Sequence, residues 1–148
     1  KSDAADMRAR LERDRPARSP WDTKLRAGGL IDIEFIAQIG QLVLGERLGA
    51  DTQGALDRLV EAGWLRDEDG ETLKTAHELY ADLTQILRAA HGADFDPDKA
   101  SEPFAQRLCQ AAHCDDLDCT ADALNIAAAR VRTLFERYIG EVTFAATE

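Results

Sequence analysis

Residues 68–91 read EDGETLKTAHELYADLTQILRAAH, and this stretch decides the class of fold. Its apolar side chains recur at intervals of three and four residues, the period of one face of an α-helix. They are Leu73, Ala76, Leu79, Tyr80, Leu83, Ile86 and Leu87. The segment is therefore predicted to be a long helix with one buried stripe, ended by Gly92.

The same helical period continues on both sides of this segment. We expect helices over 3–15 and 30–48, from Asp51 or Thr52 to Gly63, from Ser101 to His113, and from a cap at Thr120 to about residue 139. No sustained alternation of apolar and polar residues appears. The sequence therefore predicts an all-α fold, a single helical bundle of about five to seven helices.

The charge of the chain excludes several classes of function. Its 148 residues include 18 Lys and Arg against 28 Asp and Glu, and the net charge of −10 repels nucleic-acid phosphates. No apolar run approaches the ~20 residues that a membrane-spanning helix needs. We therefore expect no nucleic-acid partner and no membrane partner.

This charge is distributed unevenly along the chain. Residues 1–26 carry eight basic against five acidic side chains, whereas residues 27–148 carry ten against 23. The contrast predicts a basic N-terminal helix and linker over 1–26 and a helical bundle domain over 27–148. The basic arm either docks against an acidic or phosphorylated partner or is an exposed helix with a solvated face.

Three cysteines, Cys109, Cys114 and Cys119, lie five residues apart in the last third of the chain. An odd number at this spacing does not suggest a disulfide framework, and residues five apart do not share a helical face. The C-x-x-C pairs of structural zinc sites are missing. We therefore expect no metal site, and we expect Cys109 to be a small core residue.

Residues 30–48 are apolar around most of the helix circumference, which predicts a place in the centre of the bundle. Glu34, Gln38 and Gln41 form one narrow polar stripe, and Asp32 points to the opposite side. Asp32 lies in the first turn, where a carboxylate complements the helix dipole and bonds free N–H groups. We expect an exposed Asp32 that Asn replaces with little loss of stability, and a buried, hydrogen-bonded Glu34 whose change to Ala costs ~1–3 kcal/mol.

Two glycines, Gly28 and Gly29, precede this helix. Glycine permits a positive φ or a close backbone approach, and a helix N-terminus that follows glycines can receive an anion. Lys24 and Arg26 would reinforce such a site with positive charge.

The segment 24–38, KLRAGGLIDIEFIAQ, is more specific than its parts. It closely resembles the signature K-x-x-x-G-G-x-x-[DE]-[IL]-E-F-x-x-Q of the glutamine synthetase adenylyltransferase family, also called glutamate-ammonia-ligase adenylyltransferase. The matching residues, called the motif residues below, are Lys24, Gly28, Gly29, Asp32, Glu34, Phe35 and Gln38. Arg26 stands where many members have another Gly.

This resemblance implies a helical domain that follows a nucleotidyltransferase domain of polymerase-β type. Residues 1–26 would then be the helix and linker from that upstream domain, which is missing here. The family has two such helical domains. Gln41-Leu-Val-Leu is similar to the second copy, and the chain closes with a helix and a short tail, so we expect the C-terminal copy.

The resemblance also implies a cytoplasmic enzyme of nitrogen regulation. One half transfers AMP from ATP to a tyrosine of glutamine synthetase, and the other removes it by phosphorolysis, under the control of glutamine and the PII signalling protein. The expected partners are the upstream domain, glutamine synthetase and PII, with the motif residues on a docking or nucleotide-side surface. Alternatives are a regulatory module that binds PII or glutamine synthetase, or the equivalent domain of the adenylyl-removing half or of a PII uridylyltransferase.

Catalysis in such transferases needs a Gly-Ser turn and paired aspartates that hold two Mg²⁺ ions. The chain has no Gly-Ser pair, and the Asp94-Phe-Asp96 sequence lies in a loop that contains Pro97. We therefore expect no catalytic residue and no cofactor in this chain, with Mg²⁺ and ATP bound in the parent enzyme. The chain alone should not transfer AMP.

Overall fold

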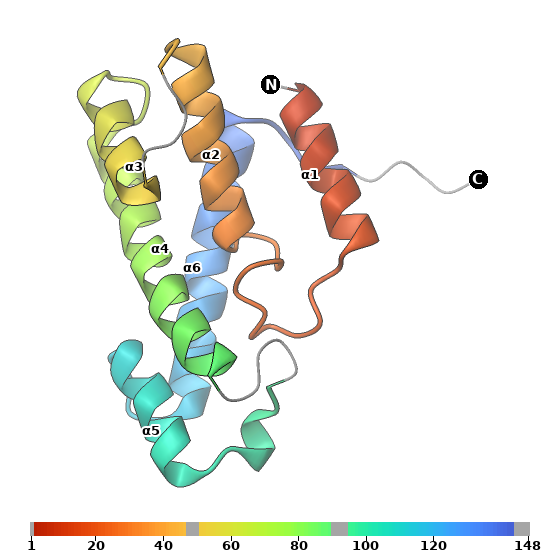
Figure 1. Cartoon of the computed structure of the whole chain (residues 1–148), viewed down its shortest axis with the longest axis vertical. Helices are drawn as coiled ribbons and strands as arrows, with labels where there is room; N and C mark the ends of the chain where they lie inside the picture. Colours follow the sequence, from red (N-terminus) through yellow and green to blue (C-terminus); the bar gives the residue numbers. More distant parts are fainter. Residues whose placement is uncertain (1, 47–50, 90–94, 144–148) are drawn as a thin grey trace.

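The computed structural model describes residues 2–46, 51–89 and 95–143. Over these ranges the chain forms six α-helices and one 3₁₀ turn, with no strand, and the predicted all-α class is confirmed (Figure 1). The elements are α1 (Ser2–Asp14), α2 (Leu30–Val43), α3 (Thr52–Glu61), α4 (Asp67–Arg88), η2 (Pro97–Lys99), α5 (Glu102–Ala111) and α6 (Leu117–Tyr138).

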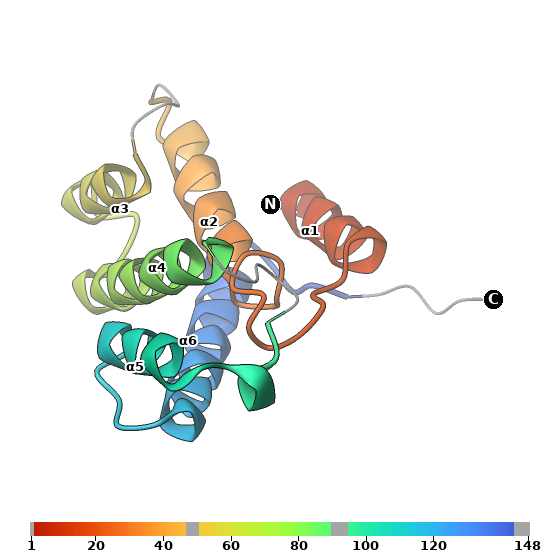
Figure 2. The same ribbon diagram turned by 60° about the horizontal axis from the view of Figure 1, so that its bottom comes forward.

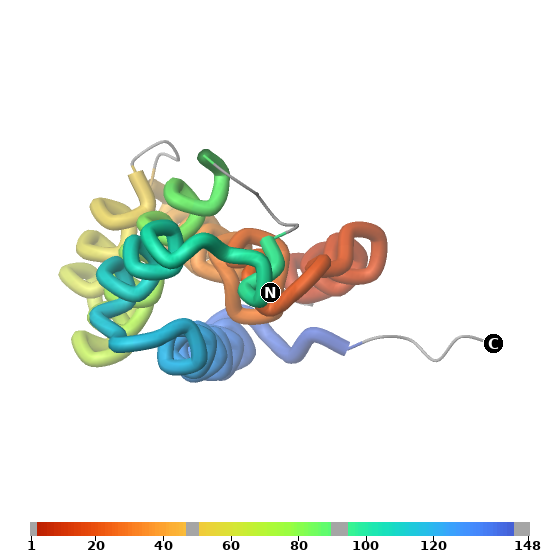
Figure 3. The backbone as a smooth tube through the Cα atoms, turned by 90° about the horizontal axis from the view of Figure 1, so that it is seen from below, coloured from red at the N-terminus to blue at the C-terminus, as the bar shows by residue number. Residues whose placement is uncertain are grey.

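Three helices, α2, α4 and α6, pack on one another and form the body of the bundle. Helix α3 packs on α2 and α4, and α5 packs on α4 and α6. Helix α1 packs on α2, on the opposite flank from α3 and α4 (Figures 1 and 3). The linker between α1 and α2 folds back between α1 and the rest of the bundle (Figure 2).

The core follows the apolar stripes that the sequence predicts. On α4, Leu73, Tyr80 and Leu83 are completely buried, and the rest of its stripe is buried or half-buried. The other helices meet this stripe with fully buried side chains, namely Ile33, Ile36, Leu56, Leu59, Leu108, Leu124, Val131 and Phe135. The linker contributes Trp21, which contacts Phe95 edge-on with 5.1 Å between ring centroids.

Helix starts agree with the predicted caps except in α6. The side chain of Asp51 accepts a hydrogen bond from Gly54 N at 2.7 Å, and Ser101 caps α5 in the same way. Helix α6 begins earlier than predicted, because Asp116 Oδ1 accepts the Cys119 backbone N–H at 2.7 Å. The prediction of Thr120 as the cap is therefore wrong.

Thr120 is buried inside the first turns of α6, where its hydroxyl donates to Asp116 O at 3.0 Å. A threonine inside a helix can donate its hydroxyl proton to the backbone carbonyl four residues earlier. The Thr120 hydroxyl is therefore hydrogen-bonded within α6 without serving as an N-cap.

Helix α2 is central only over its first three turns. It ends at Val43, before the predicted residue 48, and Leu42 and Val43 are more than half exposed. Gly45 has φ +71°, a left-handed conformation that ends helices. Residues 47–48 of the predicted helix lie outside the described residues, as do Gly92 and Asp94; α4 itself ends at Arg88.

Helix α1 is not solvated on all sides. Ala4, Ala5, Arg8 and Ala9 share one buried face, while Met7 is 58% exposed. The boundary between 26 and 27 remains a prediction, but the basic arm packs on the bundle through this face.

Candidate functional site

The motif residues occupy a tight turn and the first turns of α2. Backbone hydrogen bonds close the turn, from Gly29 N to Arg26 O at 2.9 Å and from Leu30 N to Thr23 O at 2.8 Å. The turn thus leads directly into the first helical residues, and it brings the motif against α1, α4 and α6.

Asp32 is completely buried and lies at the centre of an ionic network. Its Oδ1 accepts a hydrogen bond from Arg8 Nε. Its Oδ2 accepts one from Arg132 Nε at 3.0 Å and one from the Gly28 backbone N–H at 2.6 Å. Three donors from α1, α6 and the motif turn therefore converge on one carboxylate.

Glu12 balances the charge of this cluster. Its Oε1 lies 2.5 Å from Arg132 Nη2 and 3.5 Å from Arg8 Nη2. Arg8 is fully buried, and its Nη2 also donates to the carbonyls of Leu25 and Arg26 at 3.1 and 3.2 Å. Burial of these charges is tolerable because two arginines face two carboxylates in close hydrogen-bonded geometry. We call Arg8, Glu12, Asp32 and Arg132 the Asp32 network.

The two glycines allow the motif turn to approach other backbone segments closely. Gly28 has φ +77°, and a Cβ there would lie 1.9 Å from the Ala128 carbonyl oxygen of α6. A Cβ on Gly29 would lie 2.4 Å from the Thr23 carbonyl oxygen. The Gly28 carbonyl accepts the hydroxyl of Tyr80 from α4 at 2.8 Å. Both glycines are therefore required by space, and the first also by its dihedral angle.

The structure overturns the expectation that Asp32 is exposed. The helical geometry correctly places Asp32 opposite the polar stripe of α2, but that side faces α1 and α6. The N–H of Gly28 is already bonded to the carboxylate of Asp32. The anion at this helix start thus comes from the chain itself.

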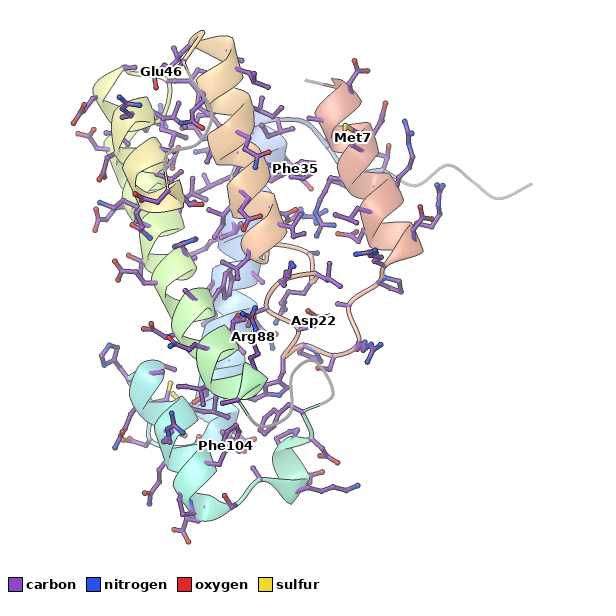
Figure 4. All side chains as sticks on the ribbon, viewed as in Figure 1. Met7, Asp22, Phe35, Glu46, Arg88 and Phe104 are labelled. Carbon is purple, nitrogen blue, oxygen red and sulfur yellow. The ribbon has the colours of Figure 1, made fainter. Side chains whose placement is uncertain are left out.

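The polar stripe of α2 also differs from the expectation. Glu34 is half-buried and Gln38 is exposed, whereas Gln41 is 2% exposed. Glu34 makes no hydrogen bond or ion pair within the described ranges, so the prediction of a buried, bonded Glu34 is wrong. Phe35 is half-buried, with its ring centroid 6.3 Å from that of Phe135 (Figure 4).

Two sets of motif residues stand apart from the half-buried Glu34 and Phe35. Gly28, Gly29 and Asp32 are buried and hold segments together, whereas Lys24 and Gln38 are exposed. The structure brings the first set together with residues outside the motif, and it leaves the second set on the surface.

Three partners of the motif were not found from the sequence. Arg8 and Arg132 pair with Asp32, and Tyr80 supports Gly28. The sequence does contain a pattern that indicates a buried position for both arginines. Arg8 follows Ala4 by four residues, and Arg132 follows Ala128 by four, so each lies on an apolar helix face where a charged side chain needs a partner.

Burial alters the ionisation of two side chains beside the turn. It lowers the pKa of Arg26, whose Nη1 donates to Pro20 O at 2.7 Å and whose Nη2 donates to Asn125 Oδ1 at 3.0 Å. Burial also raises the pKa of Tyr80, against a smaller lowering by Arg26. Tyr80 therefore stays protonated and donates to Gly28.

The three cysteines meet at the junction of α5 and α6. Cys109 is buried, as predicted, and lies in α5, Cys114 lies in the turn, and Cys119 lies in the first turn of α6. His113 has a positive φ of 56° in the turn between the two helices, and the Cys114 thiol donates to the Ala112 carbonyl at 3.5 Å. All three cysteines are free thiols.

The Cys114 thiol should react slowly with alkylating agents. Burial, reinforced by the Cys119 thiol, raises its pKa to about 11 from 9.0. At pH 8 its thiolate fraction is then about 100-fold smaller than that of an unperturbed thiol. Iodoacetamide should modify the exposed Cys119 at least tenfold faster than Cys114, measured by peptide mass spectrometry. Urea-unfolded protein serves as the control, and equal rates in the folded protein would contradict the expectation.

No group of three or more His, Cys, Asp or Glu side chains in 2–46, 51–89 and 95–143 is arranged to hold a metal ion. Each helix of these ranges is either too short or too polar to span a lipid bilayer.

Comparisons with known proteins extend over nearly the whole chain. Residues 3–139 match the model of a family described as GlnD PII-uridylyltransferase. A bifunctional glutamine synthetase adenylyltransferase/adenylyl-removing enzyme of Rhodopseudomonas palustris (strain BisB5) is 38% identical over 143 residues, covering 94% of this chain. Enzymes with the same name from Bradyrhizobium sp. (strain BTAi1 / ATCC BAA-1182) and Rhizobium meliloti (strain 1021) are 35% and 33% identical, over 94% and 92% of this chain. The chain spans 14% of the length of each of these relatives.

Proposed function

The chain belongs to the GlnD PII-uridylyltransferase domain family, and from this premise we propose that it is a helical domain of a larger glutamine synthetase adenylyltransferase/adenylyl-removing enzyme. The observation that carries the proposal is its 33–38% identity, over at least nine-tenths of the chain, to enzymes with that name. The motif residues 24–38 lie within the matched region.

In this proposal the domain supports the transfer reaction and does not catalyse it. The nucleotidyltransferase domain of the same enzyme binds ATP and Mg²⁺ and transfers AMP to a tyrosine of glutamine synthetase in the cytoplasm. We place the chain in the second, C-terminal copy, with PII as a regulatory partner. These assignments follow from the resemblance of the motif.

The two sets of motif residues would have different roles. The buried set, with the Asp32 network, keeps α1, the motif turn and α6 in a fixed arrangement. The exposed residues, Lys24 and Gln38, lie on a docking or nucleotide-side surface toward the rest of the enzyme. This division is supported by the exposure of the two side chains and by their lack of an ion pair or hydrogen bond within the described part of the chain.

The experiment that tests the proposed function compares two transfer reactions in the longer enzyme that contains this chain. Radiolabelled ATP with glutamine synthetase should label glutamine synthetase, and radiolabelled UTP with PII should leave PII unlabelled. The 148-residue chain alone should transfer neither nucleotide. Labelling of PII in place of glutamine synthetase would overturn the proposal in favour of a PII uridylyltransferase, which the name of the matching family suggests.

Replacement of Gln38 by Ala should reduce AMP transfer by the longer enzyme several-fold. Because Gln38 is exposed and has no partner within the described residues, the melting temperature of the 148-residue chain should change little. Gln106, exposed on α5 and outside the motif, provides the matched control variant Gln106→Ala. Equal rates for the two variants would remove the contact role of Gln38.

A further inference from the structure

A cavity of about 330 Å³ lies between the linker and the last turns of α4. Trp21, Thr23 and Lys24 line it from the linker, and Thr84, Leu87 and Arg88 line it from α4. This volume is at the lower end of the range for small-molecule sites.

The walls of this cavity are held in place. The hydroxyls of Thr23 and Thr84 are hydrogen-bonded at 2.5 Å and join the linker to α4. Trp21 is only 5% exposed and is held by its contact with Phe95. The two sides of the cavity therefore belong to one packed unit, as a preformed binding site requires.

Two of the side chains that line the cavity, one from the linker and one from α4, are cationic. Lys24 and Arg88 are both exposed, and neither forms an ion pair with another described residue. The chain as a whole has a net charge of −10, but these two cations make the electrostatic potential at the cavity locally positive.

The carboxylate that lines the cavity forms no ion pair with Lys24 or Arg88 in the described part of the chain. Asp22 accepts the backbone N–H of Leu25 at 3.2 Å through Oδ1 and that of Arg18 at 3.4 Å through Oδ2. Both oxygens are thus engaged by the turn. Figure 4 shows Asp22 and Arg88 on the linker and on α4, at the two sides of this region.

We propose that this cavity binds the phosphate group of a small phosphorylated molecule between Lys24 and Arg88. A phosphate presents several acceptor oxygens, which match an ammonium, a forked guanidinium and a threonine hydroxyl. The apolar walls formed by Trp21 and Leu87 accommodate the organic part of the ligand. The proposal concerns this chain alone and does not rest on the proposed function.

The test is a titration of the 148-residue chain, followed by amide NMR at constant ionic strength with chloride as the reference anion. Inorganic phosphate and AMP are the two probes. Both should give saturable shifts confined to residues 21–25 and 84–88, and Lys24→Gln and Arg88→Gln should each raise the Kd at least tenfold. Lys99→Gln and Arg107→Gln, which remove exposed cations elsewhere, should leave the Kd unchanged.

The two probes distinguish the source of the phosphate. Binding of AMP at least tenfold tighter than that of inorganic phosphate identifies a phosphorylated organic ligand, as proposed. Equal affinities for AMP and inorganic phosphate would contradict the proposed organic ligand and would indicate a site for free phosphate. Shifts that do not saturate, or that persist in the Lys24→Gln and Arg88→Gln variants, would overturn the site itself. Because all four of these side chains are exposed, the four variants should keep the parent melting temperature.

Discussion

Replacement of Asp32 by Asn should lower the free energy of unfolding by about 3–5 kcal/mol, since it removes one partner from a buried ionic cluster. Arg8 donates to one oxygen of Asp32, and Arg132 and Gly28 donate to the other. In either orientation of an Asn amide, its NH₂ group faces at least one of these donors. The change also leaves the charge of Arg8 without its closest compensation, at a fully buried site.

The measurement is thermal and urea unfolding of the 148-residue chain. For a chain of this size the loss corresponds to a fall in melting temperature of about 10 °C or more. Asp82→Asn is the matched control, because Asp82 is exposed on α4 and forms no ion pair in the described ranges. A melting temperature of Asp32→Asn within one or two degrees of the control would contradict the structural role of the Asp32 network.

Replacement of Gly28 by Ala should have an effect of similar size, for a steric reason. The added Cβ would lie 1.9 Å from the Ala128 carbonyl oxygen, and that oxygen belongs to the backbone of α6 and cannot rotate away. The positive φ adds its own strain, and displacement of the turn weakens the hydrogen bonds to Asp32 and Tyr80. Together these effects should cost about 3–5 kcal/mol.

Gly63 provides a control that separates the two causes. Its φ of +80° is close to the +77° of Gly28, but a Cβ there would meet nothing within 4 Å. Gly63→Ala should therefore cost only about 1 kcal/mol, the strain of the left-handed conformation. Equal losses for the two variants would show that the contact with α6 contributes nothing. If Gly28→Ala yields no folded protein while Gly63→Ala unfolds cooperatively, the steric contact with α6 costs at least as much as the whole free energy of unfolding, which supports the prediction.

The helices could be predicted from the sequence because each is determined by residues close together in the chain, through apolar spacing and N-cap residues. Apolar spacing in 68–91 predicts α4, and Asp51 and Ser101 mark the starts of α3 and α5. The end of α2 was predicted too late, since apolar residues continue beyond Val43 although the helix does not. Periodicity reports which side chains are apolar, but it does not report whether another element covers them.

The candidate site could be predicted only in part, for the same physical reason. The motif located the turn and the buried glycines, and helical geometry gave the correct side for Asp32. The order of burial was reversed, however, because Asp32 is completely buried and Glu34 is not. The side chains that bury Asp32 come from residues 24 positions earlier and 100 positions later, and no local pattern specifies such pairings.

The sequence separations in the Asp32 network also constrain how the chain folds. Arg8 and Arg132 come from the first and last helices, so the network can close only after both ends of the chain have reached α2. The closure of such long loops is entropically costly and slows folding. Local helices and the contact between α3 and α4 can form first, while Asp32 is still hydrated. The motif is thus completed late in folding. The Asp32 carboxylate gives up its bound water only when α1 and α6 are both in place, because their arginines then replace the hydrogen bonds to water.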